Sequence, residues 1–105
     1  MEASGDRPYS DLEVGVEGAD TRYVIRKFDT RVMEQQLYWH RDNESRDVEV
    51  LECGEGWKVQ LDNKLPIEVE PGTKIFILRH EWHRVIKGSG DLIIKIYKHG
   101  KEQAH

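Results

Sequence analysis

Turn-forming residues recur along the chain at short intervals and divide it into brief runs of β-forming residues. Breaks at Asn63, Gly72 and Gly90 are clear examples. The runs between such breaks lie at residues 23–28, 36–40, 48–51, 57–61, 67–69, 74–78, 84–86 and 92–97. Turn signals at intervals of about 8–12 residues, with β-branched and aromatic residues between them, are typical of β-sandwiches and β-barrels. The sequence therefore predicts an all-β fold.

Residues 31–38 fit this pattern least well. Val32, Met33, Gln36 and Leu37 have the spacing of a short helix as well as that of a strand. The aromatic run that follows favours a strand, because Tyr38 leads directly into a segment rich in candidate ligands. We expect a strand over residues 36–40.

The length of 105 residues is that of one domain. We expect an N-terminal arm over residues 1–11, a β-barrel domain over residues 12–99 and a polar tail over residues 100–105. A net charge of -4 argues against a general nucleic-acid binder, which would carry a basic stripe. No apolar run reaches the roughly 20 residues of a membrane helix, and the first residues lack the apolar core of a secretion signal. The single Cys53 fits a reducing, cytoplasmic setting.

Two segments about forty positions apart carry imidazoles and carboxylates. His40 and Asp42 are two residues apart, so on a strand their side chains share a face. Asp47 follows a short polar loop, and a hairpin there would return it to His40. His83 comes from the distant second segment. Such a nitrogen and oxygen ligand set suits Fe(II), Mn(II), Ni(II) or Zn(II) better than a metal that prefers thiolates.

The carboxylates of the first segment can also be explained without a metal. Asp42 and Asp47 are good turn formers, and Arg41 and Arg46 would pair with them as surface ions of little energetic value. His80, in the second segment, has the position of a surface residue.

The spacing of the first segment resembles the first sequence motif of the cupins. That motif runs His, one residue, His, four residues, Glu, six residues, Gly. The chain has the same spacing, with His40, Asp42, Asp47 and Gly54 at the four positions. Asp42 replaces the second His, and Asp47 replaces Glu with a side chain one methylene shorter.

The second segment resembles the second cupin motif, which runs Gly, five residues, Pro, one residue, Gly, two residues, His. Gly72, Leu78, His80 and His83 occupy these positions. The resemblance covers about residues 37–97 and implies a small single-domain jelly-roll β-barrel with its site in the barrel mouth. It implies His40, Asp42, Asp47 and His83 as ligands of a divalent metal, with Asp47 alternatively supporting the ligands from outside.

Lys58 and Gln60 fall in a strand that lines the barrel in cupins. They alternate with Trp57, Val59 and Leu61. If their face points inward, they are substrate-binding residues, and if it points outward they are solvated.

The resemblance implies a cupin that binds a divalent metal and acts on or binds a small polar metabolite, such as a sugar or a carboxylic acid. An isomerase and a dioxygenase are both compatible with it. One alternative is a non-catalytic binding module. Another is an oxygenase of the 2-oxoglutarate type that uses His40, Asp42 and His83. Cupins are often dimers, and we expect a homodimer in which residues 21–28 extend the sheet of the partner.

Overall fold

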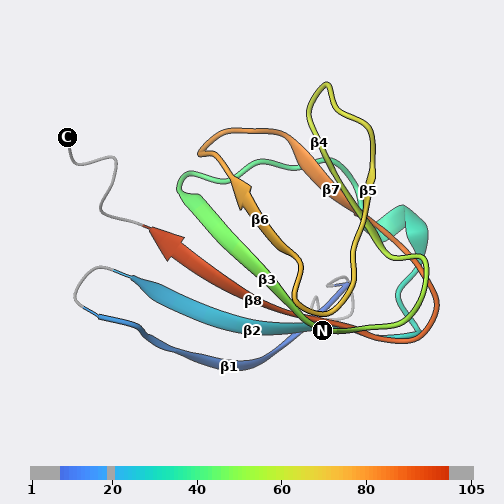
Figure 1. Ribbon diagram of the computed structural model, residues 1–105, viewed down its shortest axis with the longest axis horizontal. Coiled ribbons are helices and arrows are strands. Elements are labelled where there is room, and N and C mark those ends of the chain that lie inside the picture. Colours follow the sequence, from blue (N-terminus) through green and yellow to red (C-terminus); the bar gives the residue numbers. More distant parts are fainter. Residues whose placement is uncertain (1–7, 19–20, 100–105) are drawn as a thin grey trace, which may run out of the picture.

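The computed structural model describes residues 8–18 and 21–99, and the fold is given for these residues. Over this part the chain forms strands and one short 3-10 helix (Figure 1). Their bounds are β1 Ser10–Val16, β2 Arg22–Phe28, η2 Glu34–Gln36, β3 Ser45–Cys53, β4 Lys58–Leu61, β5 Ile67–Glu68, β6 Lys74–Ile77, β7 His83–Ile86 and β8 Leu92–His99. No helix within the described residues has the length and apolar character needed to cross a membrane.

The strands form two antiparallel sheets. The larger sheet has the order β1-β2-β8-β3-β6 and the smaller one the order β5-β4-β7. Strands far apart in the chain, such as β2 and β8, are therefore hydrogen-bonded neighbours, which is typical of jelly rolls. Figure 1 shows the two sheets as two layers that diverge from one another at one end. The all-β, jelly-roll prediction is confirmed.

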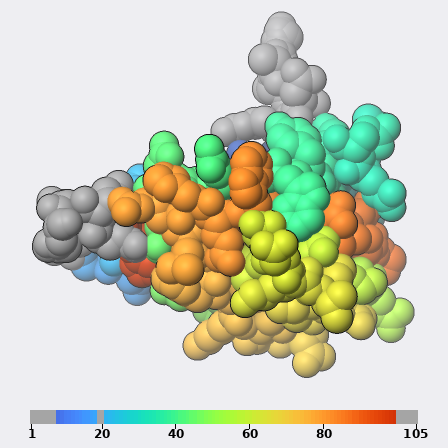
Figure 2. Space-filling model, turned by 90° about the horizontal axis from the view of Figure 1, so that it is seen from above, coloured from blue at the N-terminus to red at the C-terminus, as the bar shows by residue number. Residues whose placement is uncertain are grey.

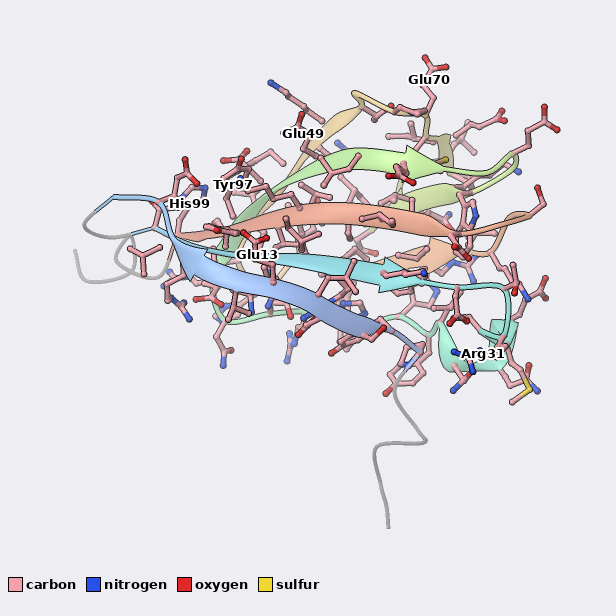
Figure 3. All side chains as sticks on the ribbon, turned by 90° about the horizontal axis from the view of Figure 1, so that it is seen from below. Glu13, Arg31, Glu49, Glu70, Tyr97 and His99 are labelled. Carbon is pink, nitrogen blue, oxygen red and sulfur yellow. The ribbon has the colours of Figure 1, made fainter. Side chains whose placement is uncertain are left out.

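The core lies between the two sheets and receives alternate residues of their strands. Val24, Val48 and Ile96 come from the larger sheet, and Val59 and Leu61 from the smaller one. Because side chains alternate across a strand, their neighbours in sequence face outward. Figure 3 labels Glu13, Glu49, Tyr97 and His99, which belong to the outer face of the larger sheet.

Trp57 precedes β4, whose other end is paired with His83 through Leu61. Its side chain is fully buried, and its indole N–H donates to the carbonyl oxygen of Ser89 at 2.9 Å. Gly54 lies beside the same loop. A Cβ at Gly54 would lie 1.8 Å from the carbonyl oxygen of Ser89, so the backbones approach too closely for any side chain. This contact explains the glycine at the end of the first motif.

The segment expected to be a strand over residues 36–40 differs. The 3-10 helix Glu34–Gln36 ends at its first residue, and within the segment His40 alone pairs, through an isolated bridge to His83. The side-chain oxygen of Gln36 accepts the backbone N–H of Met33 at 2.9 Å. This local bond gives the backbone an alternative to a sheet ladder.

Two further expectations need correction at the N-terminal side. β1 begins at Ser10, so the expected boundary between residues 11 and 12 falls inside this strand. Asp11 is held there by Arg26, whose Nε lies 2.7 Å from its carboxylate. β2, which was expected to add to a partner's sheet, lies between β1 and β8 and has no free edge. The rest of the arm, residues 1–7, and the tail, residues 100–105, lie outside the described residues.

Candidate metal centre

The segment that carries His40 and Asp42 is joined by backbone hydrogen bonds to the segment that carries His80 and His83. His40 and His83 exchange N–H···O bonds of 3.0 and 2.9 Å, and the N–H of His80 donates to the carbonyl oxygen of Asp42 at 2.8 Å. His80 itself is exposed and has a φ of 68°, the left-handed conformation that favours glycine. Figure 2 shows the two segments side by side on one face, in blue-green and orange. The backbone therefore fixes the side chains that these segments carry.

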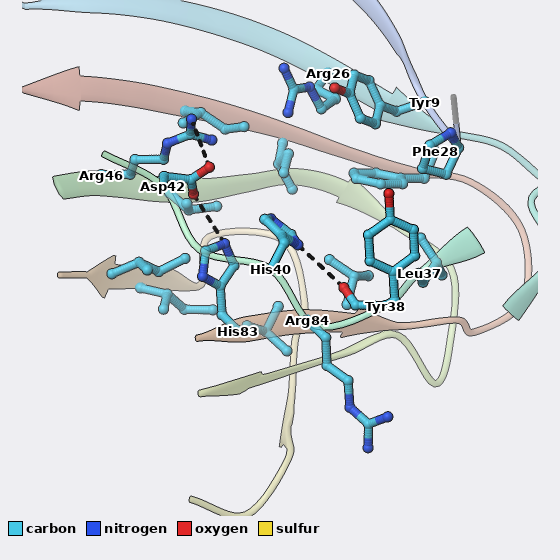
Figure 4. Close-up of a pocket in the computed structure, with 18 of the residues that line it drawn as sticks. Tyr9, Arg26, Phe28, Leu37, Tyr38, His40, Asp42, Arg46, His83 and Arg84 are labelled. Carbon is cyan, nitrogen blue, oxygen red and sulfur yellow. Dashed lines mark hydrogen bonds and ion pairs between the residues drawn. The ribbon is translucent and has the colours of Figure 1, made fainter. Parts of the chain in front are cut away.

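His40, Asp42 and His83 form one cluster, which we name the imidazole–carboxylate cluster (Figure 4). One ligand atom from each residue lies within 4.8 Å of the other two. The two rings are 4.1 Å apart between centroids and inclined by 64°. His83 is buried, with 6% of its surface exposed. The structure thus brings together three of the four residues nominated from the motifs.

The hydrogen bonds of His83 determine which of its nitrogens is available. Nδ1 lies 2.9 Å from the carbonyl oxygen of Glu81. Because a carbonyl oxygen only accepts, Nδ1 carries the proton and a neutral ring has its lone pair on Nε2. Nε2 in turn faces Oδ2 of Asp42 at 3.3 Å. With a neutral ring both of these atoms are acceptors, and with a protonated ring Nε2 donates to the carboxylate.

His40 repeats this arrangement. Its Nδ1 lies 3.3 Å from the carbonyl oxygen of Tyr38, which leaves Nε2 as the remaining ligand atom. Burial lowers the pKa of His40, and the neighbouring His83 lowers it further, against the smaller opposite effects of Tyr38 and Asp42. A lowered pKa favours the neutral imidazole, which is the form that binds metal ions.

Asp42 carries the negative charge of the cluster. Burial alone would raise the pKa of its carboxyl group, but His83 and then Arg46 outweigh this effect, and the pKa is lowered. Oδ1 lies 3.2 Å from Nη2 of Arg46. Oδ2 is buried and faces Nε2 of His83 at 3.3 Å, but no hydrogen bond of acceptable geometry reaches it from the described residues. A buried carboxylate oxygen without a hydrogen bond, next to two imidazole lone pairs, fits a cation.

Asp47 lies on the opposite side of β3. Its carboxylate is 2.7 Å from Nε2 of His99, and more than half of its side chain is exposed. Its register partners are Phe76 and Tyr97, on the outer face of the sheet. The expected return of Asp47 to His40 does not occur, because alternation along β3 directs Arg46 and Val48 inward instead.

Arg46 is the residue that the sequence interpretation missed, having placed it on the surface. It lines the cavity, its side chain is only 14% exposed, and it contacts Asp42. The signal was present in the alternation of Arg46, Val48 and Val50 with Asp47 and Glu49. Aliphatic residues at every second position identify the inner face of the strand.

Lys58 and Gln60 are not among the cavity-lining residues. Val59 lines the cavity from the other face of β4. Gln60 accepts from Nε of Arg84 at 2.9 Å and donates to the carbonyl oxygen of Lys64 at 2.9 Å. Figure 4 shows Arg84 directed away from the two imidazoles. Lys58 and Gln60 therefore lie on the face of β4 that points away from the cavity.

The cavity beside the cluster has a volume of about 710 Å³, a size typical of small-molecule sites. Most of its wall surface is apolar and comes from both sheets. Polar groups gather at one end, where the imidazole–carboxylate cluster and several basic side chains lie (Figure 4). Its apolar lining residues include Val48, Val59, Ile75, Ile77, Val85, Ile94 and Ile96.

No family model matches the sequence, and no curated protein sequence matches it either. Solved structures do match. The DMSP lyase DddQ from Ruegeria pomeroyi DSS-3 is 12% identical with a TM-score of 0.74, covering 98% of this chain and 52% of that one. The cobalt(II) form of HppE is 18% identical with a TM-score of 0.64, covering 88% of this chain and 54% of that one.

One further solved structure matches over most of its own length as well as most of this chain. A cupin domain from Bordetella pertussis Tohama I is 15% identical with a TM-score of 0.59, covering 88% of this chain and 94% of that one. Similarity at this level of identity concerns the fold, and function depends on the site. The two sheets, their strand order and these matches together show that the chain has a cupin fold.

Proposed function

We propose that this protein is a small cupin that binds a divalent metal ion through His40, Asp42 and His83 and acts on a small polar metabolite in the adjoining cavity. The observation that carries the proposal is the convergence of Nε2 of His83 on the buried Oδ2 of Asp42, 3.3 Å apart, with His40 beside them. A cation beside them would be bound by both atoms and would satisfy the buried oxygen. The cobalt(II) form of HppE supports a metal in a protein of similar fold.

The ligand set consists of two imidazoles and one carboxylate. This composition is the one used by non-haem Fe(II) oxygenases, which keep further positions open for their substrates. It favours an oxygenase over an isomerase, with Fe(II) as the preferred ion and Mn(II), Ni(II) or Zn(II) as the alternatives. When bound, such an ion supplies redox or Lewis-acid chemistry at the polar end of the cavity.

The chain's own residues prepare this end of the cavity. The carbonyl oxygens of Tyr38 and Glu81 fix the protonated nitrogen of each imidazole, and this sets the ring orientation. Arg46 holds one oxygen of Asp42 and directs the other toward His83. The aliphatic wall limits water around a bound metabolite, which strengthens polar interactions at the cluster.

The test is elemental analysis of protein purified without a metal-affinity tag, before and after incubation with Fe(II), Mn(II), Ni(II) or Zn(II). We expect close to one ion per chain in the wild type and a strong loss in His40→Ala and His83→Ala. Oxygen uptake by the iron form with carboxylic acids and sugars then separates an oxygenase from an isomerase. A wild type that retains no ion after any of the four incubations would overturn the proposal.

A second candidate is a binding module without catalysis. Arg46 lies at the inward position of β3 and pairs with Asp42, so the carboxylate is partly neutralised without any metal. The same cavity would then hold a small polar ligand by hydrogen bonds alone. Saturable ligand binding by metal-free protein, without turnover by the metal-loaded form, would favour this candidate.

We also infer a homodimer in a reducing, cytoplasmic setting. β1 is an edge of the larger sheet, and Leu12, Val14 and Val16 on it are exposed by 56%, 72% and 69%. Exposed edges with aliphatic side chains favour pairing with another chain. A second copy that pairs along β1 and packs against this face would cover them.

A further inference from the structure

The inner face of the larger sheet ends in a row of basic residues. Arg22 on β2, Lys98 on β8 and Arg46 on β3 are register partners across three adjacent strands. Arg26, two positions farther along the inner face of β2 after Val24, also lines the cavity. We name these four residues the basic cluster. Like charges directly opposite each other in a sheet are destabilising, so this arrangement needs a compensating group.

The carboxylates nearby do not fully compensate the basic cluster. Glu44 pairs with Arg22 at 2.5 Å and lies 3.8 Å from Arg46. Asp11 pairs with Arg26 at 2.7 Å, and Asp42 with Arg46 at 3.2 Å. Among the described residues, no ion pair or hydrogen bond involves the ammonium group of Lys98. Four basic side chains therefore share three carboxylates.

Arg46 also has a buried hydrogen-bond donor without a partner among the described residues. Its Nε is buried, and no acceptor in the described part of the chain bonds to it. A buried guanidinium donor without an acceptor is costly, and the Arg46 side chain forms part of the cavity wall.

The electrostatics of Lys98 agree with a local excess of positive charge. Its pKa is lowered, first by burial and then by Arg46 and Arg26, against a smaller opposite effect of Glu44. The chain as a whole carries a net charge of -4, so this end of the cavity has the opposite sign to the whole protein. An excess of basic over acidic side chains at this end favours ligands of negative charge.

We propose that the cavity binds its small-molecule ligand through an oxyanionic group, a carboxylate or a phosphate, held by Arg46 and Lys98 beside the imidazole–carboxylate cluster. That the rest of the ligand lies at His40 and His83 depends on the proposed function, in which these residues bind the metal ion. The anion site itself is made by side chains that are not metal ligands. An oxyanion would accept from the guanidinium group of Arg46 and from the ammonium group of Lys98, and charge-assisted bonds of this kind are among the strongest in proteins.

The experiment measures binding by isothermal titration calorimetry with the full chain, at fixed ionic strength and in phosphate-free buffer. The probes are malonate, inorganic phosphate and the neutral analogue malonamide, each with metal-free and with metal-loaded protein. The test variant is Lys98→Gln. Lys95→Gln is the matched control, since Lys95 lies on the same strand but on its outer face, over the rings of Tyr23 and Tyr97.

We expect malonate or phosphate to bind the metal-free wild type and malonamide to bind at least tenfold more weakly. Loss of one charge-assisted contact in Lys98→Gln should weaken the anion by about tenfold, with no change in Lys95→Gln. The preferred anion distinguishes a carboxylate ligand from a phosphate ligand. Arg46→Lys, which keeps the charge near Asp42 but lacks the planar set of guanidinium donors, should also weaken binding.

Equal affinity of wild type and Lys98→Gln, or equal binding of malonate and malonamide, would overturn the anion site. The outcome is separable from that of the proposed function. Anion binding that depends on Lys98 in a protein without metal affinity supports the anion site and rejects the metal centre. Metal binding without measurable affinity for either anion supports the metal centre and rejects the anion site.

Discussion

Nε2 of His83 lies 3.3 Å from Oδ2 of Asp42, while Nδ1 of the same ring already faces the carbonyl oxygen of Glu81 at 2.9 Å. One proton cannot serve both contacts of a neutral ring. The cluster therefore needs either a second proton or a cation. This relationship gives the metal proposal its sharpest tests.

Asp42→Asn and Asp47→Asn separate the two carboxylates of the first motif. Removal of a supporting group around a metal typically costs about 10–100-fold in affinity, so loss of the ligand Asp42 should cost about 100-fold or more. Asp47→Asn should leave affinity unchanged, because its carboxylate pairs with His99 on the outer face. Metal titration of both variants checks this. A larger loss in Asp47→Asn than in Asp42→Asn would contradict the assignment.

Chelation should lower the thermal stability of the wild type. A ligand at 100 times its Kd stabilises the folded state by about 2.7 kcal/mol, which corresponds to roughly 10–20 °C in Tm for a domain of this size. Differential scanning calorimetry with and without a chelator measures the shift. His40→Ala is the informative variant, because His40 is more exposed than His83 and its loss disturbs the core less. Its Tm should not respond to chelator, and an undiminished response would count against His40 as a ligand.

Trp57→Phe should destabilise the fold by roughly 1–3 kcal/mol. The substitution leaves a gap in the core and removes the buried hydrogen bond to Ser89. Trp82→Phe is the matched control, since Trp82 is 41% exposed and should change stability by less than about 0.5 kcal/mol. Urea unfolding followed by circular dichroism compares the free energies of unfolding. Similar losses in both variants would contradict the structural difference between the two tryptophans.

Cys53 should react with iodoacetamide only at a pH above the usual thiol range. Burial raises the pKa of its thiol, and Glu68 and Glu70 raise it further. Because the thiolate is the reactive form, the native rate profile should be displaced to higher pH than that of the urea-unfolded chain. The unfolded thiol ionises at a lower pH than the folded one. The stability that the protonated Cys53 thiol contributes to the folded state is therefore present below the unfolded pKa and is lost as pH rises through the raised folded pKa. Coincident midpoints in the two profiles would show that the folded environment has no such effect.

Val14→Glu should convert the expected dimer to a monomer. A charge on the exposed face of β1 opposes its burial against a second copy. Leu65→Glu is the control, because Leu65 is 84% exposed in the turn between β4 and β5. Light scattering at micromolar concentration should give twice the chain mass of 12.3 kDa for the wild type and for Leu65→Glu. A wild type of single-chain mass would exclude the dimer.

Much of the fold was predictable because its signals are local. Alternation in Trp57, Val59 and Leu61 gives the inner face of β4 directly. The same rule, applied to Val48 and Val50, would have placed Arg46 inward and Asp47 outward. The motif spacing instead favoured Asp47, because spacing counts residues along the chain and does not record which face of a strand each one occupies.

The sequence by itself determined the all-β class and nominated His40, Asp42 and His83, since turn residues, alternation and motif spacing are properties of short stretches of chain. Only the tertiary structure decided that Arg46 and Lys98 meet, because β3 and β8 are paired through a register set by the whole sheet. It also decided that Nε2 of His83 faces Asp42, because that direction depends on the carbonyl oxygen of Glu81. Charge balance in the cavity arises from such long-range contacts, and no local pattern in the sequence encodes it.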